Sequence, residues 1–264
     1  MNIIVLIKQI PDIEKNIKIT VDSKSYSINR QGIPSIMNPA DKNALEYALC
    51  IKDQLNATVK VVTMGPPQAE AVLREAMSMG ADEGYLATDR SFAGSDTLST
   101  SLVLSKAIQE FCDKPDYIFC GHQALDGDTG QVGPGVAERF NFPQWIHVRS
   151  ILEIRPNTLL VDRIFDGFQE TIEIHSPSMV AFVKNSNLPR LPGLRNLFWA
   201  KDAPIKTITN EDLKIPPETI GISGSPTRVV RTFKIEMDKT VIKKNIETGN
   251  ELLETMLEKI GEVK

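Results

Sequence analysis

The sequence predicts an α/β fold built on a doubly wound, mostly parallel sheet of the Rossmann-like type. Short apolar runs typical of strands buried on both faces recur four times in the first 120 residues. A segment with helical periodicity or a helix start signal follows each run. Strands separated by helices pair in parallel, and ligands bind such sheets beyond the carboxyl ends of the strands. We therefore expect the residues that follow these strands to share one edge of the sheet.

The first strand and the first helix have the clearest local signals. Residues 3–7 form a continuous apolar run that Lys8-Gln9-Ile10-Pro11 ends, and residues 17–28 alternate in a way that predicts an inserted hairpin. Asn38 suits the N-cap of a helix, Pro39 suits its first position, and Asp41 lies in its first turn near the positive end of the dipole.

The later strands and helices of this pattern follow in order. Gly65-Pro66-Pro67 turns the second strand into the second helix, which ends at Gly80. Asp96 opens the third helix. The expected strands are residues 59–64, 83–88 and 116–120, and the expected helices are residues 69–79 and 96 to about 111.

After Phe140 the pattern changes to alternating segments, which predict strands added to or beside the sheet. Residues 165–168, Phe-Asp-Gly-Phe, predict a hairpin turn. The expected strands are residues 145–153, 158–165, 171–174 and 179–183. These observations indicate a first domain over residues 1–188.

Residues 189–199 mark a boundary, because two prolines and a glycine precede a group of bulky apolar side chains. They form either a buried helix start or an exposed apolar anchor for a partner protein. From Ala200 onward we expect no further α/β pattern, and only residues 242–260 have helical periodicity. We interpret residues 201–264 as an extended arm that packs on another chain.

A glycine-rich stretch, residues 120–134, joins the fourth strand to a helix over residues 136–140. Pro134 has no amide hydrogen and fits best in the first turn, so this helix is expected to start near Gln131 to Gly133. The amides around Thr129 to Gly133 then point outward, where the helix dipole favours an anion. With Gly127, Gly130 and Gly133 leaving room for a phosphate, the stretch indicates nucleotide binding more than a plain turn.

Composition limits the remaining function classes. The net charge of −4 gives no reason to expect nucleic acid or an anionic membrane surface as a partner. No apolar run approaches the roughly 20 residues that span a bilayer, and the start predicts a strand instead of a signal peptide. Three cysteines without CxxC spacing argue against disulfides and against a cysteine-bound metal. We expect a cytoplasmic protein.

Six motifs together resemble the beta subunit of electron-transfer flavoproteins. They are residues 7–12, 38–46, 63–67, 76–82, 121–134 and 189–199, and the resemblance covers essentially the whole chain. It implies an adenine-nucleotide-binding fold, paired with a homologous alpha subunit that carries its own FAD. It also implies that residues 189–200 form a loop that docks onto a flavin-dependent dehydrogenase. The docking residues implied are Leu194, Leu197 and Phe198.

The resemblance also implies where the nucleotide binds. Its contacts fall at the end of the first strand, the helix start at Asn38, the residues around Met64 and the glycine-rich stretch. The implied binding residues are Leu6, Ile7, Lys8, Asn38, Asp41, Thr63, Met64, Gly65, Gly121, His122, Gln123, Ala124, Leu125, Asp126, Gly127, Asp128, Thr129, Gly130, Gln131 and Val132. His147 and His175 are expected to be structural, and no residue is expected to be catalytic or to bind a metal.

Two types of this family differ in the nucleotide held by the beta subunit. One type holds AMP as a structural ligand. The other holds FAD, takes a hydride from NADH, and sends one electron to ferredoxin or flavodoxin and the other through the alpha flavin to the dehydrogenase. Residues 126–133, Asp-Gly-Asp-Thr-Gly-Gln-Val-Gly, resemble the second type, which makes FAD our hypothesis and AMP the alternative.

Two readings outside this family stay open. An ATP-using enzyme of the same fold type carries a Ser-Gly-Gly type loop after the first strand, whereas this chain has Lys8-Gln9-Ile10-Pro11. A nucleotide-binding regulatory protein without a redox role needs neither the apolar loop nor the long tail. Purification with or without a flavin-bearing partner separates this last reading from ours.

Overall fold

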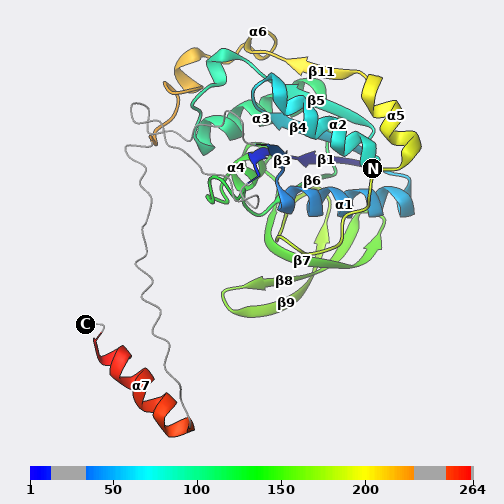
Figure 1. The fold of residues 1–264 in the computed structure, drawn as a ribbon. Helices are drawn as coiled ribbons and strands as arrows, with labels where there is room; N and C mark the ends of the chain where they lie inside the picture. The colour runs from blue at the N-terminus through cyan, green and yellow to red at the C-terminus, as the bar shows by residue number, and fades with distance from the viewer. Residues whose placement is uncertain (13–33, 229–247, 263–264) are drawn as a thin grey trace. The chain divides into compact units, whose positions relative to one another are not determined.

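The computed structural model describes residues 1–12, 34–228 and 248–262, which belong to two compact units (Figure 1). The first unit spans residues 1–230 and contains every strand in the described part of the chain. The second unit spans residues 231–264, and its described helix is α7 (Gly249–Glu262). The hairpin expected over residues 17–28 lies outside the described residues.

A nine-stranded sheet forms the centre of the first unit, with its strands in the order β11-β5-β4-β1-β6-β10-β7-β8-β9. Neighbours from β11 to β7 pair in parallel, whereas β7, β8 and β9 pair antiparallel. The predicted α/β class and mostly parallel sheet are thus confirmed. The strands are β1 (Asn2–Leu6), β4 (Thr58–Met64), β5 (Glu83–Ala87), β6 (Tyr117–Gly121), β7 (Gln144–Arg155), β8 (Thr158–Phe165), β9 (Phe168–His175), β10 (Ser178–Phe182) and β11 (Ile205–Ile208).

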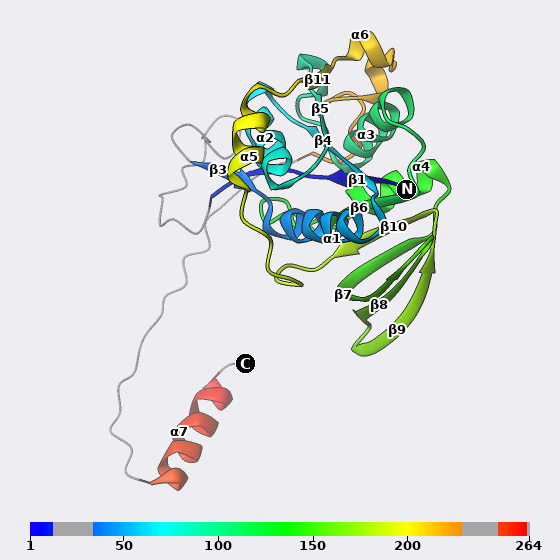
Figure 2. The ribbon, with the colours of Figure 1, turned by 90° about the vertical axis from the view of Figure 1, so that its right-hand side faces the viewer.

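Helices cover both faces of the sheet, which explains why the strands are apolar throughout. Alternate residues of β1 belong to two separate cores: Ile3 and Val5 pack with α1 and α2, and Ile4 and Leu6 pack with α3 and α4 (Figure 2). Val5 pairs with Val61 of β4 on one side and with Phe119 of β6 on the other. The helices are α1 (Pro39–Leu55), α2 (Glu70–Met79), α3 (Thr97–Phe111), α4 (Val132–Phe140), α5 (Leu194–Asp202) and α6 (Asn210–Leu213), with 3-10 turns η1 (Pro67–Ala69), η2 (Arg90–Phe92) and η3 (Pro217–Thr219).

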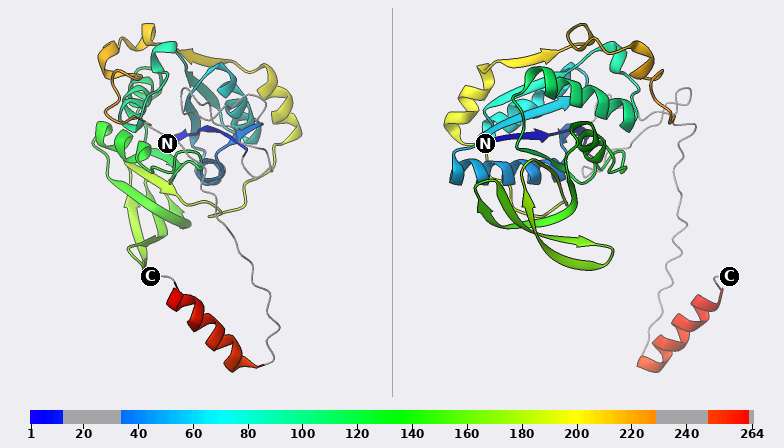
Figure 3. Two further views of the ribbon diagram at one scale, coloured as in Figure 1. Left: turned by 60° about the vertical axis from the view of Figure 1, so that its left-hand side comes forward. Right: turned by 180° about the vertical axis from the view of Figure 1, so that it is seen from behind.

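The three antiparallel strands β7, β8 and β9 form a curved ribbon beside α1 (Figure 3). The expected turn at residues 165–168 is confirmed, because Phe165 pairs with Phe168 and both Asp166 and Gly167 have positive φ. β9 begins at Phe168, three residues before its expected start. Pairing with β8 extends it through Gln169 and Glu170, whose side chains give no alternating apolar signal.

The expectation that no α/β pattern follows Ala200 is wrong for residues 205–213. β11 pairs in parallel with β5 at the sheet edge, and Ile208 and Leu213 are buried in the core. The domain boundary expected at residue 201 therefore falls inside the first unit. Packing of residues 231–264, including α7, on another chain stays a prediction.

Two smaller features complete the first unit. β2 (Gln9–Pro11) and β3 (Ser35–Met37) form a separate antiparallel pair just beyond the end of β1. None of the helices in residues 1–12, 34–228 and 248–262 is long and apolar enough to cross a membrane.

Candidate functional site

The glycine-rich stretch forms a loop, residues 122–131, between β6 and α4. α4 starts at Val132 with Gln131 at its N-cap, which confirms the start expected from Pro134. The loop folds back on itself, because the amides of Gly127 and Asp128 both donate to the carbonyl of Ala124, at 3.2 and 2.8 Å. None of the described residues accepts a hydrogen bond from the five amides of residues 129–133. These N–H groups at a helix N-terminus are suited to bind an anion.

Asn38 fixes the loop to the start of α1. The fully buried side chain makes no capping bond within its own helix. Its amide nitrogen instead donates to the carbonyl of Gln123 at 3.0 Å, and its Oδ1 accepts from the amide of Leu125 at 3.4 Å. Asn38 is thus the N-cap residue of α1 as expected, and its side chain positions the loop after β6.

Asp41 joins the ends of two strands to α1. Its Oδ2 accepts from the amide of Lys8 at 2.8 Å, and its Oδ1 accepts from the amide of Gly121 at 2.9 Å. Burial raises the pKa of the carboxyl from 3.8 to about 7, and hydrogen bonds from Asn38, Lys8 and Gly121 oppose this rise. Because both oxygens already accept protein N–H groups, the geometry assigns Asp41 to shaping the site.

Lys8 brings a positive charge to the loop. Its ammonium lies 2.6 Å from Oδ1 of Asp126, whose side chain is 7% exposed, whereas the Lys8 side chain is 45% exposed. The pair connects the end of β1 with the loop after β6, the next strand in the sheet. A partly exposed ammonium beside open amides adds to the attraction for a phosphate group.

The glycines of this region serve different purposes. A Cβ on Gly121 would lie 2.4 Å from Oδ1 of Asp41, and one on Gly133 would lie 2.6 Å from Sγ of Cys120. The expectation that Gly133 leaves room for a phosphate is therefore corrected, because the missing side chain makes room for Cys120. Gly127 faces open space, where the nearest atom is Nζ of Lys8 at 3.9 Å, and Gly130 has a φ of +64°.

His122 is the loop residue whose surroundings were least expected. Its ring lies against that of His147, with the ring centroids 3.9 Å apart. Burial lowers the pKa of His122, and the neighbouring His147 lowers it further while Asp128 opposes the shift. Within the described residues, the buried Nδ1 of His122 has no hydrogen-bond partner. Sequence reasoning treated His147 as a structural strand residue, and its φ of +59° has no signal in the sequence.

The end of β4 completes the predicted edge. β4, β1 and β6 are neighbouring strands, with β1 in the middle. Residues 63–65 at the end of β4 therefore lie on one side of residues 6–8, and Gly121 at the end of β6 lies on the other side. Thr63 is fully buried, and none of the described groups forms a hydrogen bond with its hydroxyl. The amide of Gly65 donates to the carbonyl of Ala87 at 3.0 Å. The shared edge is confirmed, and the contacts of these residues with a nucleotide stay predictions.

The apolar segment forms α5, and its side chains are exposed. Leu194 is 72% exposed and Phe198 is 71% exposed, and the one residue of α5 that is buried is Ala200. This supports the interpretation as an exposed anchor over that of a buried helix. Leu188, Leu191, Leu197 and Trp199 add to the exposed apolar surface.

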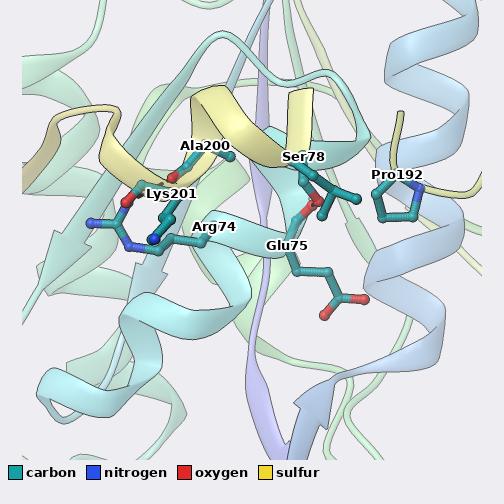
Figure 4. Close-up of a pocket in the computed structure, with 7 residues that line it drawn as sticks. Arg74, Glu75, Ser78, Pro192, Ala200 and Lys201 are labelled. Atoms are coloured by element: carbon teal, nitrogen blue, oxygen red, sulfur yellow. Dashed lines mark hydrogen bonds between the residues drawn. The ribbon is translucent and has the colours of Figure 1, made fainter. Parts of the chain in front are cut away.

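A shallow depression of about 280 Å³ lies between α2 and α5 (Figure 4). Arg74 of α2 reaches across it and donates to the carbonyls of Ala200 at 2.6 Å and Lys201 at 2.8 Å. The depression is lined by Arg74, Glu75, Ser78, Pro192, Leu197, Ala200 and Lys201. Across residues 1–12, 34–228 and 248–262, no group of three or more His, Cys, Asp or Glu side chains is arranged to hold a metal ion.

Comparison with known proteins agrees with this arrangement. A family model described as "Electron transfer flavoprotein domain" matches residues 26–213. The chain is 43% identical over 264 residues to the electron transfer flavoprotein subunit beta of Thermoanaerobacterium thermosaccharolyticum, with 99% of this chain and 98% of that protein covered.

Two further relatives are named as parts of acyl-CoA reductase systems. The chain is 42% identical over 234 residues to the caffeyl-CoA reductase-Etf complex subunit CarD of Acetobacterium woodii, with 88% of this chain and 87% of that protein covered. It is 38% identical over 239 residues to the acryloyl-CoA reductase electron transfer subunit gamma of Anaerotignum propionicum, with 88% of each covered.

Proposed function

The chain belongs to the electron transfer flavoprotein family, as a subunit of the beta type, and on this premise we propose that it pairs with an alpha subunit that carries its own FAD. In this heterodimer the beta chain holds an adenine nucleotide at the edge formed by β4, β1 and β6. The heterodimer carries electrons to or from a flavin-dependent dehydrogenase; two relatives are named for a caffeyl-CoA reductase and an acryloyl-CoA reductase, which favours a partner that acts on an acyl-CoA.

The amides of residues 129–133, which have no hydrogen-bond partner among the described residues although Gly133 is buried, support nucleotide binding most directly. These amides lie at the N-terminus of α4, and the ammonium group of Lys8 lies beside the same loop. The N–H dipoles and the positive charge would both attract a phosphate group. In our proposal these amides bind the diphosphate. Asn38 holds the loop in position, and Asp41 holds the ends of β1 and β6 beside it.

FAD is our hypothesis for the bound nucleotide, with AMP as the alternative. A dinucleotide presents two phosphates, and a run of five amides beside a lysine suits two phosphates better than one. The open space at Gly127 leaves room for the part of the ligand beyond the diphosphate. When bound here, a flavin supplies hydride acceptance from NADH and the division of the electron pair between ferredoxin or flavodoxin and the alpha flavin.

The protein's own residues bind and orient in this proposal, and none acts as an acid, a base or a nucleophile. The side chains of Leu6 and Ile7 are buried in the two cores on opposite faces of the sheet, so in this proposal the backbone at the end of β1 lies against the ligand. Burial lowers the pKa of His122, which favours its neutral form, and its buried Nδ1 has no hydrogen-bond partner among the described residues. The α5 surface of Leu194, Leu197 and Phe198 is the proposed docking site for the dehydrogenase.

The nucleotide content of the purified heterodimer tests the proposal. We expect two FAD per heterodimer, no AMP, and NADH oxidation that depends on both ferredoxin and the acyl-CoA partner. One FAD with one AMP would replace the FAD hypothesis with the AMP alternative. Purification as a flavin-free homo-oligomer would refute the redox role and support a nucleotide-binding regulatory protein.

A further inference from the structure

α5 is held in place by few apolar contacts. Ala200 is the one residue of its nine that is buried, and an alanine side chain contributes little hydrophobic free energy. A helix of this length is marginal in water by itself. Leu197 and Trp199 are covered over about half of their surfaces, and polar contacts at the two ends of the helix add to these apolar contacts.

Arg74 holds the C-terminal end of α5. The last carbonyls of a helix have no partner within the helix and carry partial negative charge. Nη1 of Arg74 donates to two of them, Ala200 and Lys201, and Nε of Arg74 is fixed by Oε1 of Glu70 at 2.7 Å. The guanidinium thus joins the end of α5 to α2 (Figure 4).

Arg190 holds the chain just before the N-terminal end of α5. Its Nε lies 3.1 and 3.0 Å from the two oxygens of Glu46, and its backbone amide donates to Oε2 of Glu46 at 2.8 Å. Its Nη2 lies 2.9 Å from Asp53. The Glu46 side chain is 10% exposed, so these charge-assisted bonds are shielded from water.

The segment that leads to Arg190 is tied to the same face of α1. Nδ2 of Asn43 donates to the carbonyl of Asn187 at 2.8 Å, and Nδ2 of Asn187 donates back to the carbonyl of Asn43 at 2.9 Å. The hydroxyl of Tyr47 donates to the carbonyl of Ser186 at 2.7 Å. Residues 185–190 therefore run along α1 and are fixed to it by these hydrogen bonds; we call this segment the strap.

We propose that Arg190 and Arg74 are positioning residues that hold the apolar face of α5 in the orientation in which the dehydrogenase binds it. The inference rests on the proposed function, because the docking role of α5 belongs to that proposal. A helix that is ordered before contact loses less conformational entropy on docking, so the two arginines act on the affinity for the partner. They touch neither the nucleotide loop nor its neighbours among the described residues, so electron transfer within the docked complex keeps its rate.

The test compares Arg190→Ala and Arg190→Lys with a matched control, Arg155→Ala. Arg155 also pairs with two carboxylates, Glu153 and Glu173, but lies in β7 away from α5. Hydrogen–deuterium exchange of residues 194–202 measures how well α5 is held, and turnover with the dehydrogenase gives KM for the flavoprotein and kcat. Both are measured on the full chain in the form in which it purifies.

In Arg190→Ala we expect exchange in α5 to quicken about tenfold, KM to rise about tenfold, and kcat and nucleotide content to stay within twofold. Arg190→Lys restores part of both effects, because lysine keeps the charge but cannot contact both oxygens of Glu46 at fixed geometry. The Arg155→Ala control leaves both measurements unchanged. Arg74→Lys provides a second variant if Arg190→Ala does not fold.

Two results would overturn the inference, and they differ from failure of the proposed function. Unchanged exchange in α5 would show that Arg190 does not hold the helix, whatever the protein does. Faster exchange with an unchanged KM would show that the orientation of α5 is irrelevant to docking. Absence of any flavin-bearing partner would refute the proposed function, and the exchange measurement would still decide whether Arg190 holds α5.

Discussion

Replacing Asp41 by asparagine tests the part that the buried carboxyl plays in stability. The carboxyl is surrounded by protein and accepts hydrogen bonds from the amides of Lys8 and Gly121. Burial raises its pKa from 3.8 to about 7. Because the pKa is higher in the folded chain than in the unfolded chain, the folded state binds more protons between about pH 4 and pH 7.

The sign of the effect follows from this difference. The contribution of Asp41 to the free energy of unfolding is largest below pH 4 and falls as the pH rises through 7. Between pH 6 and pH 8 the loss is about 1 kcal/mol for a folded-state pKa near 7. Asparagine does not ionise, so the variant lacks this slope. The substitution also adds a loss of about 1–3 kcal/mol that does not depend on pH, because one of the two N–H donors then faces an amide NH₂ group.

Urea unfolding of the wild-type chain and of Asp41→Asn at pH 5, 6, 7 and 8 measures the effect. The difference in free energy of unfolding between the two proteins should shrink as the pH rises. His122 and other groups titrate in both proteins, so they cancel in this difference. Asp202→Asn, which changes an exposed carboxyl, serves as the control for the substitution itself. A difference for Asp41→Asn that stays constant with pH would refute the raised pKa of Asp41.

Three further changes test other parts of the structure. Leu194→Ala should slow electron delivery to the dehydrogenase several-fold in stopped-flow assays, because it removes an exposed apolar side chain of the proposed docking surface. The flavin content should not change. Loss of flavin would show that Leu194 supports the fold. Gly133→Ala should destabilise by about 1–3 kcal/mol in thermal unfolding, because its Cβ meets Cys120, and equal stability of Gly133→Ala and Gly127→Ala would contradict this. Lys8→Ala should weaken nucleotide binding about tenfold at low salt and less at high salt by calorimetry, and a salt-independent change would argue against a phosphate contact.

The helix starts could be predicted from the sequence because their signals are local. Asp96 caps α3 as expected, with its carboxylate accepting from the amides of Leu98 and Ser99. Pro134 limited the start of α4 to within a few residues, since its ring is compatible with only the first turn. The shared edge could also be predicted, because parallel pairing brings the carboxyl ends of all the strands to one side of the sheet.

What the sequence could not reveal depends on long-range contacts. β11 has four residues, and its pairing with β5 involves residues about 120 positions away, which no periodicity reports. The ring contact between His147 and His122 occurs where His147 has a positive φ near the start of β7. Gly133 has the same composition signal as Gly127, and only the position of Cys120 separates their roles.

α1 has three buried polar residues, Asp41, Asn43 and Glu46, and its N-cap Asn38 is a fourth; each has a partner outside the helix. Asn38 and Asp41 bind the loop after β6 and the ends of β1 and β6, whereas Asn43 and Glu46 bind residues 185–190 before α5. Buried polar groups are tolerated where they are hydrogen-bonded. The apolar face of α1 packs in the core, and its buried polar residues can therefore serve to bind other segments. The polar residues at the start of α1 therefore join the loop between β6 and α4 and the segment before α5 to one helix, so the positions of both segments depend on α1.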